Sequence, residues 1–303
     1  MMGLLLSLLL AASPVTVSAA GDLQLSASTP EAQVAPLATL LQGDVRFVNL
    51  EGPLTASGRE SGLTGEGKPQ GPLKFNAPPA MARWLQGKVD GVSLANNHAL
   101  DQGEAGLAET VAHLREQGIQ SATASEEAEL VRQGQRVRLI AREVTEGWPE
   151  AAAVALEARV REARKVGPVL VSLHWGRTGA LLPSKEQRRL AARLIDAGAT
   201  AVLGHGPHTP QGIERRGRGV IAYSLGNVAF SCRCTEERDA YVLRFRIDAK
   251  GAAVDVEAVP LRAGLREPPR LVQDDPGAAQ LIQSLSEDLG SDARIQDGRV
   301  RIR

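Results

Sequence analysis

The stretch Ala199–Glu214 reads ATAVLGHGPHTPQGIE and predicts a buried strand that ends at a metal site. Its first half is an apolar run, and Gly206-Pro207 is typical of a tight turn. Two neutral imidazoles, His205 and His208, flank that turn and are suited to zinc, manganese or iron. A single loop histidine is usually solvated or part of the core, but four of the five histidines directly follow apolar runs. These four are His98, His174, His205 and His208.

The composition is that of a globular protein with no excess charge. The chain has 303 residues, 43% of them hydrophobic, which is enough for one large domain or for one domain with a small appendage. Lys+Arg and Asp+Glu are both 35, so the net charge is zero. This balance argues against the broad basic surface of a nucleic-acid-binding protein. The two cysteines, Cys232 and Cys234, fit ordinary loop thiols better than a redox or metal site, and they do not decide the compartment.

The amino-terminal leucine run at Leu4–Ala12 has the length of a signal-peptide core and is too short to cross a bilayer. No positive charge precedes it. We interpret residues 1–13 as a signal peptide, which predicts an exported or cell-envelope protein, and residues 14–303 as a single domain. Within that domain, residues 262–303 form a carboxyl-terminal tail with a closing helix. The alternative is that the leucines are the first buried element of a cytoplasmic protein.

Between these ends, predicted strands and helices alternate, as in an α/β fold. Amphipathic spacing predicts helices over Glu104–Gln117 and Pro149–Lys165, and Ser184 with Gln187 forms a capping box for a third. A helix capped by Thr29, an edge strand over Arg136–Ile140, antiparallel strands within Tyr241–Leu261 and a helix over Ala278–Leu289 are further expectations.

Polar side chains follow six predicted strands, each at the point where the strand ends. Ligands of α/β sheets bind outside the carboxyl ends of the strands, so we expect these side chains to meet in one crevice. Carboxylates, amides and imidazoles together suit a centre of two divalent ions, of the Mn, Fe, Zn or Mg type. The six clusters are Asp22, Asn49 with Glu51, Asn97 with His98, His174, His205 with His208, and Asn227.

Longer motifs at these places resemble a known family. They are Gly21-Asp22, Asn49–Gly52, Ser93–His98 with Asp101 and Gly103, His174–Gly176, Gly204-His205 with Pro207-His208, and Tyr223–Asn227. The set resembles the poly-γ-glutamate capsule synthesis proteins of the CapA type, over most of the chain from about Gly21 to Phe230 and into the tail. That family is related to the calcineurin-like metallophosphoesterases. The resemblance implies an α/β four-layer sandwich of two mainly mixed β-sheets flanked by helices.

The resemblance also implies roles for single residues. Asp22 would hold one metal ion, Glu51 would bridge two, and His208 would return to the first. Asn97, His174 and His205 would hold the second ion, and His98 is similar to the histidine that protonates the leaving group. Asn49, Asn96, Asp101 and Asn227 would contact the ligands or the substrate.

Two positions depart from the relatives' patterns. Gln24 stands where many metallophosphoesterases have the histidine of Asp-x-His, and Thr178 stands where relatives have the glutamate of His-Trp-Gly-x-Glu.

The sequence therefore predicts a metal-dependent hydrolase in which a water activated by two metal ions attacks a phosphoester or amide bond. The resemblance implies action on an anionic cell-envelope polymer such as poly-γ-glutamate, during its synthesis or processing, with membrane-associated biosynthetic partners. The alternative, which Gln24 and Thr178 keep open, is a non-catalytic envelope protein that binds or guides the polymer.

Overall fold

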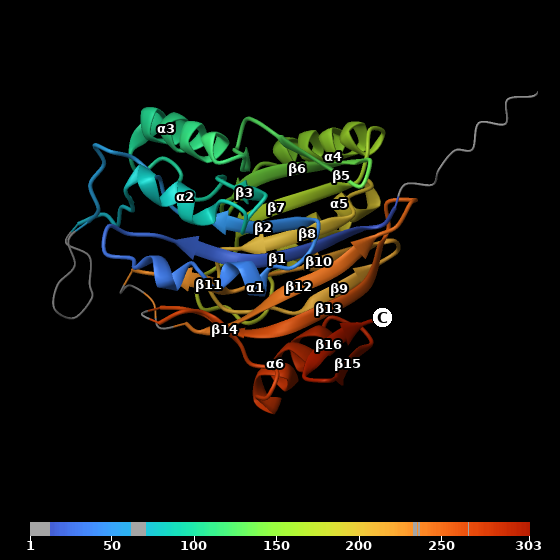
Figure 1. The fold of residues 1–303 in the computed structure, drawn as a ribbon. Coiled ribbons are helices and arrows are strands. Elements are labelled where there is room, and N and C mark those ends of the chain that lie inside the picture. The colour runs from blue at the N-terminus through green and yellow to red at the C-terminus, as the bar shows by residue number, and fades with distance from the viewer. Residues whose placement is uncertain (1–12, 62–70, 233–234, 236, 266) are drawn as a thin grey trace, which may run out of the picture.

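The computed structural model describes residues 13–61, 71–232, 235, 237–265 and 267–303. The leucine run of the predicted signal peptide and Cys234 lie outside these residues. Within them, two mixed β-sheets pack face to face and helices cover both outer faces (Figure 1). The α/β sandwich predicted from the sequence is confirmed.

Ten strands form the first sheet: β1 (Val15–Gln24), β2 (Val45–Leu50), β3 (Gly91–Ser93), β4 (Gln120–Ala122), β11 (Asn227–Phe230), β12 (Asp239–Ile247), β13 (Ala253–Arg262), β14 (Arg270–Leu271), β15 (Ala293–Gln296) and β16 (Arg299–Ile302). The sheet runs in the order β15-β16-β13-β12-β1-β2-β3-β4. β1 pairs antiparallel with β12, and parallel with β2 and, in its last part, with β11. Asp22 thereby lies between Asn49 of β2 and Asn227 of β11.

Six strands form the second sheet: β5 (Ala128–Arg132), β6 (Gln135–Val144), β7 (Val169–Trp175), β8 (Ala201–His205), β9 (Ile213–Arg216) and β10 (Gly219–Ala222). Their order is β5-β6-β7-β8-β10-β9. β6, β7 and β8 are parallel neighbours, so their carboxyl ends meet at one edge.

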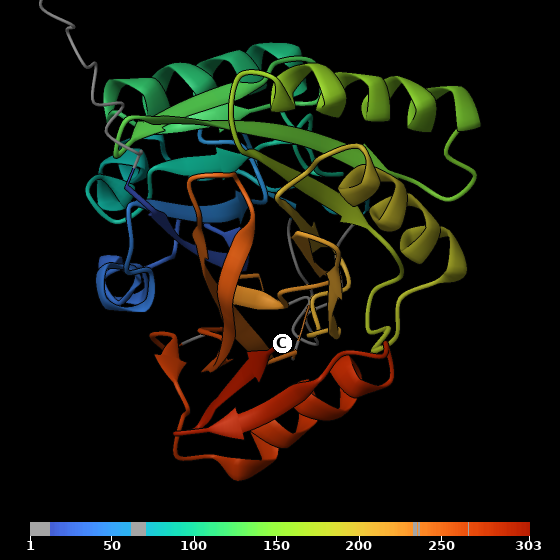
Figure 2. The ribbon, with the colours of Figure 1, turned by 90° about the vertical axis from the view of Figure 1, so that its right-hand side faces the viewer.

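Helices enclose the sandwich on both sides. Against the first sheet lie α1 (Leu37–Leu40), α2 (Ala82–Leu85), α3 (Gly103–Glu116) and two 3-10 turns, η1 (Glu31–Gln33) and η2 (Pro79–Met81). Against the second sheet lie α4 (Glu150–Arg164) and α5 (Lys185–Asp196), both visible along the outer side in Figure 2. α5 begins with the predicted capping box, in which Ser184 accepts a hydrogen bond from Gln187 N.

The buried residues form three main hydrophobic layers, and the strands alternate between them. In β2, Val45 and Phe47 face the second sheet, whereas Val48 and Leu50 face the helices. The same alternation holds in β6, β7 and β8. Because successive side chains of a strand point to opposite faces, the layer that a strand residue joins tells us which way its neighbours point.

Two predicted elements were wrong. The helix expected from Thr29 is replaced by η1 and α1, because Pro36 has no N–H to continue a helix begun at Pro30. β6, expected at an edge, lies between β5 and β7. The antiparallel strands of the Tyr241–Leu261 region are present as β12 and β13.

The carboxyl-terminal part adds to the first sheet. The closing helix, α6 (Pro276–Glu287), starts two residues earlier than expected, where Asp275 caps it. The hairpin β15-β16, which the sequence analysis did not predict, pairs with β13 at the edge of the sheet (Figure 1). No helix in the described ranges is both long and apolar enough to span a membrane. The division at residue 262 stays a prediction.

Candidate metal centre

The predicted site lies between the two sheets, at the carboxyl ends of four strands. Alternation places Asn49 and Glu51 on the side of β2 that faces the second sheet. It also places His174 of β7 and His205 of β8 on the side that faces the first sheet. The register pairs His174 directly with His205. The two sheets therefore each contribute side chains to one buried cluster.

Asp22 is the centre of this cluster, and it is fully buried. Its Oδ1 accepts a hydrogen bond from Asn49 Nδ2 at 2.9 Å and lies 3.5 Å from His205 Nδ1. Its Oδ2 lies 3.1 Å from His208 Nδ1 and 3.3 Å from the N–H of Gly206. The two parallel pairings of β1 shift register next to Asp22, and such irregularities commonly re-aim a side chain.

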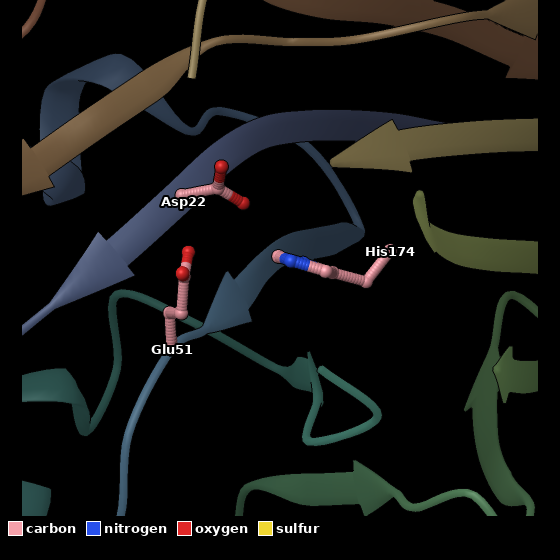
Figure 3. Close-up of side chains that lie close together, drawn as sticks. All are labelled: Asp22, Glu51 and His174. Carbon is pink, nitrogen blue, oxygen red and sulfur yellow. The ribbon is translucent and has the colours of Figure 1, made fainter. Parts of the chain in front are cut away.

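Three side chains are close enough to share one ion. Ligand atoms of Asp22, Glu51 and His174 all lie within 4.8 Å of one another, and their side chains point toward a common space (Figure 3). Glu51, 1% exposed, has Oε1 3.8 Å from His208 Nε2 and 4.0 Å from His98 Nε2. Among the described residues this carboxylate–imidazole group could hold a metal ion.

Unsatisfied polar atoms support that assignment. Glu51 Oε2 and both ring nitrogens of His205 are buried and have no hydrogen-bond partner. Buried polar atoms are almost always satisfied, because an unmade hydrogen bond costs about 1–3 kcal/mol. A divalent cation would bind the Glu51 oxygen and one ring nitrogen of His205 through their lone pairs, so the residues present fit a metal.

The electrostatics are those of a site built for positive charge. Burial opposes ionisation of Asp22, but the neighbouring imidazoles of His205 and His208 outweigh it and hold its pKa well below the usual range. Burial raises the pKa of Glu51 to about 8, although the charge of His208 opposes the change. Burial lowers the pKa of His174 to about 3, which keeps this imidazole neutral and able to ligate. Burial disfavours the charged form of His208, but Glu51 and Asp22 raise its pKa to about 10.

His98 is held beside the cluster and not inside it. Its Nδ1 lies 2.7 Å from Asp101 Oδ2, which fixes the tautomer with Nδ1–H donating and leaves Nε2 facing Glu51. The ring packs on Phe75, with ring centroids 3.9 Å apart, and Phe75 N donates to the same Asp101 oxygen. This arrangement suits a group that gives or takes a proton at Nε2.

The two adjacent asparagines are placed differently. Asn96 is buried, and its Nδ2 donates to Asn49 Oδ1 at 3.1 Å and to Leu50 O at 2.9 Å. Its Oδ1 accepts the N–H of His98. Asn97 is exposed, and no hydrogen bond of its side chain to another described residue joins it to the cluster. The structure thus brings Asn96 into the network, and the ligand role expected for Asn97 stays a prediction.

His208 is oriented by two acceptors. Its Nδ1 lies 3.0 Å from Asn227 Oδ1 as well as close to Asp22, so Nδ1–H donates to these oxygens and Nε2 is left for a ligand. His208 adopts a left-handed backbone conformation (φ 61°), which is rare outside glycine and commonly occurs at functional sites. Its ring contacts Phe230 edge-on.

The two departures from the relatives' patterns have clear placements. Gln24 is buried and turned into the fold, where its Nε2 donates to Leu25 O and its Oε1 accepts from Cys232 N, both at 2.8 Å. Thr178 is exposed in the loop after β7. Neither side chain contacts the cluster.

The sequence analysis missed one carboxylate next to this site. Glu143 lies near the end of β6 and pairs in register with His174. The run Val137, Leu139, Ala141 faces the first sheet, so Glu143 continues that row toward the site. The alternation of apolar and polar residues along 135–144 was the sequence signal that could have identified Glu143.

The comparisons with known proteins agree with the resemblance. Residues 16–231 match the family of bacterial capsule synthesis proteins PGA_cap. The chain belongs to this family. A "PGA biosynthesis protein CapA" of Bacillus subtilis (strain 168) is 27% identical over 226 residues, 68% of this chain and 59% of that protein. A "Capsule biosynthesis protein CapA" of Bacillus anthracis is 28% identical over 195 residues, 56% of this chain and 47% of that protein.

A third relative of this PGA_cap chain is a "Probable polyglutamine synthesis accessory protein" of Mycobacterium tuberculosis (strain CDC 1551 / Oshkosh). It is 29% identical over 271 residues, 77% of this chain and 69% of that protein. The chain spans only about half the length of the two Bacillus relatives it matches, 59% and 47%.

Gly206→Ala is expected to dismantle the site. Gly206 has φ 105°, and an added Cβ would lie 2.7 Å from Trp175 O and 3.1 Å from His174 Nε2. We expect lower metal content and a loss of about 1–3 kcal/mol in the free energy of unfolding, measured by elemental analysis and thermal denaturation. Gly179→Ala is the matched control, because Gly179 also has a positive φ (75°) but no atom within 4 Å of the added Cβ. Equal metal loss in both variants would contradict the prediction.

Proposed function

We propose that this chain is a metal-dependent hydrolase that acts on an anionic cell-envelope polymer of the poly-γ-glutamate type. The observation that carries the proposal is the buried cluster of Asp22, Glu51, His174 and His205, with its unsatisfied carboxylate oxygen and ring nitrogens. Membership of the capsule synthesis family supports the choice of polymer.

The chain's own residues would divide the work of binding and proton transfer. Asp22, Glu51, His174, His205 and His208 would hold two divalent ions. When bound, these ions would lower the pKa of water and neutralise negative charge that develops on the substrate. Asn49 Nδ2 donates to Asp22 and thereby fixes that carboxylate, and Asn227 orients His208.

His98 would complete the reaction at the leaving group. Asp101 holds Nδ1–H, so Nε2 can carry a proton toward the substrate. As the bond to the leaving atom breaks, His98 Nε2 delivers that proton, and the oxygen of water remains on the carbonyl or phosphorus. The stack on Phe75 and the N–H of His98 on Asn96 keep the ring from turning away.

A non-catalytic role in binding or guiding the polymer is the second candidate. The observation that favours it is Gln24, which occupies the place of a metal-binding histidine in many metallophosphoesterases and is bonded to the backbone instead. A weak first metal site would leave a polymer-binding surface without turnover.

Metal content and hydrolysis measured on the same preparation separate the two candidates. We expect purified protein loaded with Mn²⁺ or Zn²⁺ to bind up to two ions and to cleave poly-γ-glutamate or a chromogenic phosphodiester. His205→Ala should lower both occupancy and rate, whereas His113→Ala, a partly exposed histidine on α3, should change neither. Metal-loaded wild type that cleaves neither substrate faster than His205→Ala would favour the binding role.

A further inference from the structure

Glu143 is a carboxylate next to the site, and its side chain has no partner among the described residues. Its side chain is half-buried, and no other described residue makes a hydrogen bond or an ion pair with it. Glu143 also lies outside the group of Asp22, Glu51 and His174 whose ligand atoms are close enough to share an ion. Its oxygens are therefore not committed to the fold or to that group.

The strand register places the Glu143 side chain on the same face of the second sheet as His174 and His205. Glu143, His174 and His205 form one row across β6, β7 and β8, because each is the register partner of the next. Paired residues of parallel strands project to the same face, and His205 of this row reaches Asp22 in the other sheet. Across the sandwich β1 packs on β8 and β4 packs on β6, so the strand orders place Glu143 of β6 on the β3 side of the site, where His98 follows β3. Burial raises the pKa of Glu143, and the nearby charge of His98 opposes the change.

The unpaired carboxylate of Glu143 can bind only those substrate groups that donate a hydrogen bond. An ionised carboxylate only accepts hydrogen bonds, and such charge-assisted bonds from N–H groups are about twice as strong as neutral ones. A phosphodiester has no donor on its leaving oxygen, so it can offer Glu143 no hydrogen bond there. An amide presents an N–H at the leaving nitrogen, next to the position that His98 protonates.

We propose that Glu143 accepts a hydrogen bond from the N–H of the leaving group and so selects an amide-linked substrate over a phosphodiester. This inference rests on the proposed function for the location of the cleaved bond. It gives Glu143 a role in substrate recognition that Gln24 does not provide, since the Gln24 side chain is bonded to Leu25 O and Cys232 N.

The test compares Glu143→Gln and Glu143→Ala with wild type on a γ-glutamyl anilide and on a chromogenic phosphodiester. Glu146→Gln is the matched control, an exposed glutamate three residues further on that undergoes the same change of charge. We expect kcat/KM for the anilide to fall at least ~10-fold in both Glu143 variants, while the phosphodiester rate stays equal or rises. Metal content, measured for each variant, should not change.

Three results would overturn the inference. A fall by the same factor on both substrates would make Glu143 a positioning residue for His98, especially with a shifted pH profile. Loss of metal would make it a ligand. No difference from Glu146→Gln would leave it without a role in recognition.

A binding measurement keeps this inference separate from the proposed function. A γ-glutamyl dipeptide and its ester isostere, in which oxygen replaces the N–H, are titrated calorimetrically into metal-loaded protein. We expect wild type to bind the amide about tenfold more tightly than the ester, and Glu143→Ala, which has no acceptor, to bind both about equally. If wild type cleaves nothing but shows this ratio, hydrolysis fails and the inference stands. An unchanged ratio in Glu143→Ala overturns the inference whatever the hydrolysis result.

Discussion

His98→Ala is expected to lower hydrolysis by ~10²–10⁴-fold while metal content stays close to that of wild type. The reason is geometric. His98 Nε2 lies 4.0 Å from Glu51 Oε1, at the border of the cluster, and Nδ1 is committed to Asp101 at 2.7 Å. The side chain can therefore deliver a proton without being a ligand. Rates on poly-γ-glutamate and on a chromogenic phosphodiester, with elemental analysis of each preparation, provide the measurement.

Two further variants make the His98 result specific. Asp101→Asn keeps the ring but replaces the carboxylate by an amide that can either accept from or donate to Nδ1. The tautomer is then no longer fixed, so we expect a smaller loss of roughly 10–10²-fold and a shifted pH profile. His113→Ala should leave the rate unchanged, because the ion pairs that His113 forms among the described residues, with Glu109 and Glu116, lie on the surface of α3. A His98→Ala protein that is both inactive and metal-free would instead make His98 a ligand.

Divalent-metal affinity is expected to fall by ~10²-fold or more when the pH is lowered from 8 to 6. The pKa of Glu51 is raised to about 8 by burial, and the pKa of His208 is raised to about 10 because Glu51 and Asp22 outweigh burial. Both groups therefore hold protons in the metal-free protein at neutral pH. They must lose them to ligate, and each proton released contributes about tenfold in affinity per pH unit. His174, whose pKa burial lowers to about 3, does not compete in this range.

The same shifts fix the sign of the stability effect. A group whose pKa is raised on folding contributes stability that is present below its ordinary pKa and lost as the pH rises through the raised value. The metal-free protein should thus lose stability between about pH 4.5 and 8 through Glu51, and between about pH 6.5 and 10 through His208. Stabilisation by metal should grow with pH. Calorimetric titrations in two buffers of different ionisation enthalpy count the protons, and a count of zero with pH-independent affinity would contradict the prediction.

Local signals in the sequence predicted the strand ends well. The apolar runs before His174 and His205 became β7 and β8, and the Ser184–Gln187 capping box starts α5 as expected. These features depend on neighbouring residues, so they can be recognised without knowledge of the fold. Placing the ends of β1, β2, β7 and β8 at one edge followed from the rule for α/β sheets.

The direction of single side chains was harder to predict. Asn96 and Asn97 are the same residue type in adjacent positions, and only the turn after β3 decides that Asn96 faces Asn49. The register shift at Asp22 breaks the period of two that would otherwise give its direction. Glu143 was missed because the residues that follow it carry no motif, and its importance comes from pairing with His174 in a neighbouring strand.

The cluster joins the two sheets at this edge through polar side chains from both. Asp22 and Glu51 come from one sheet, and His174 and His205 come from the other. An ion bound by residues of both sheets would hold the sheets together, because its binding free energy would also stabilise their packing against each other. In the metal-free protein, the buried unsatisfied groups would destabilise the packing of these strand ends. Local unfolding of the sandwich would then begin at the strand ends that hold the ion, once the ion has dissociated.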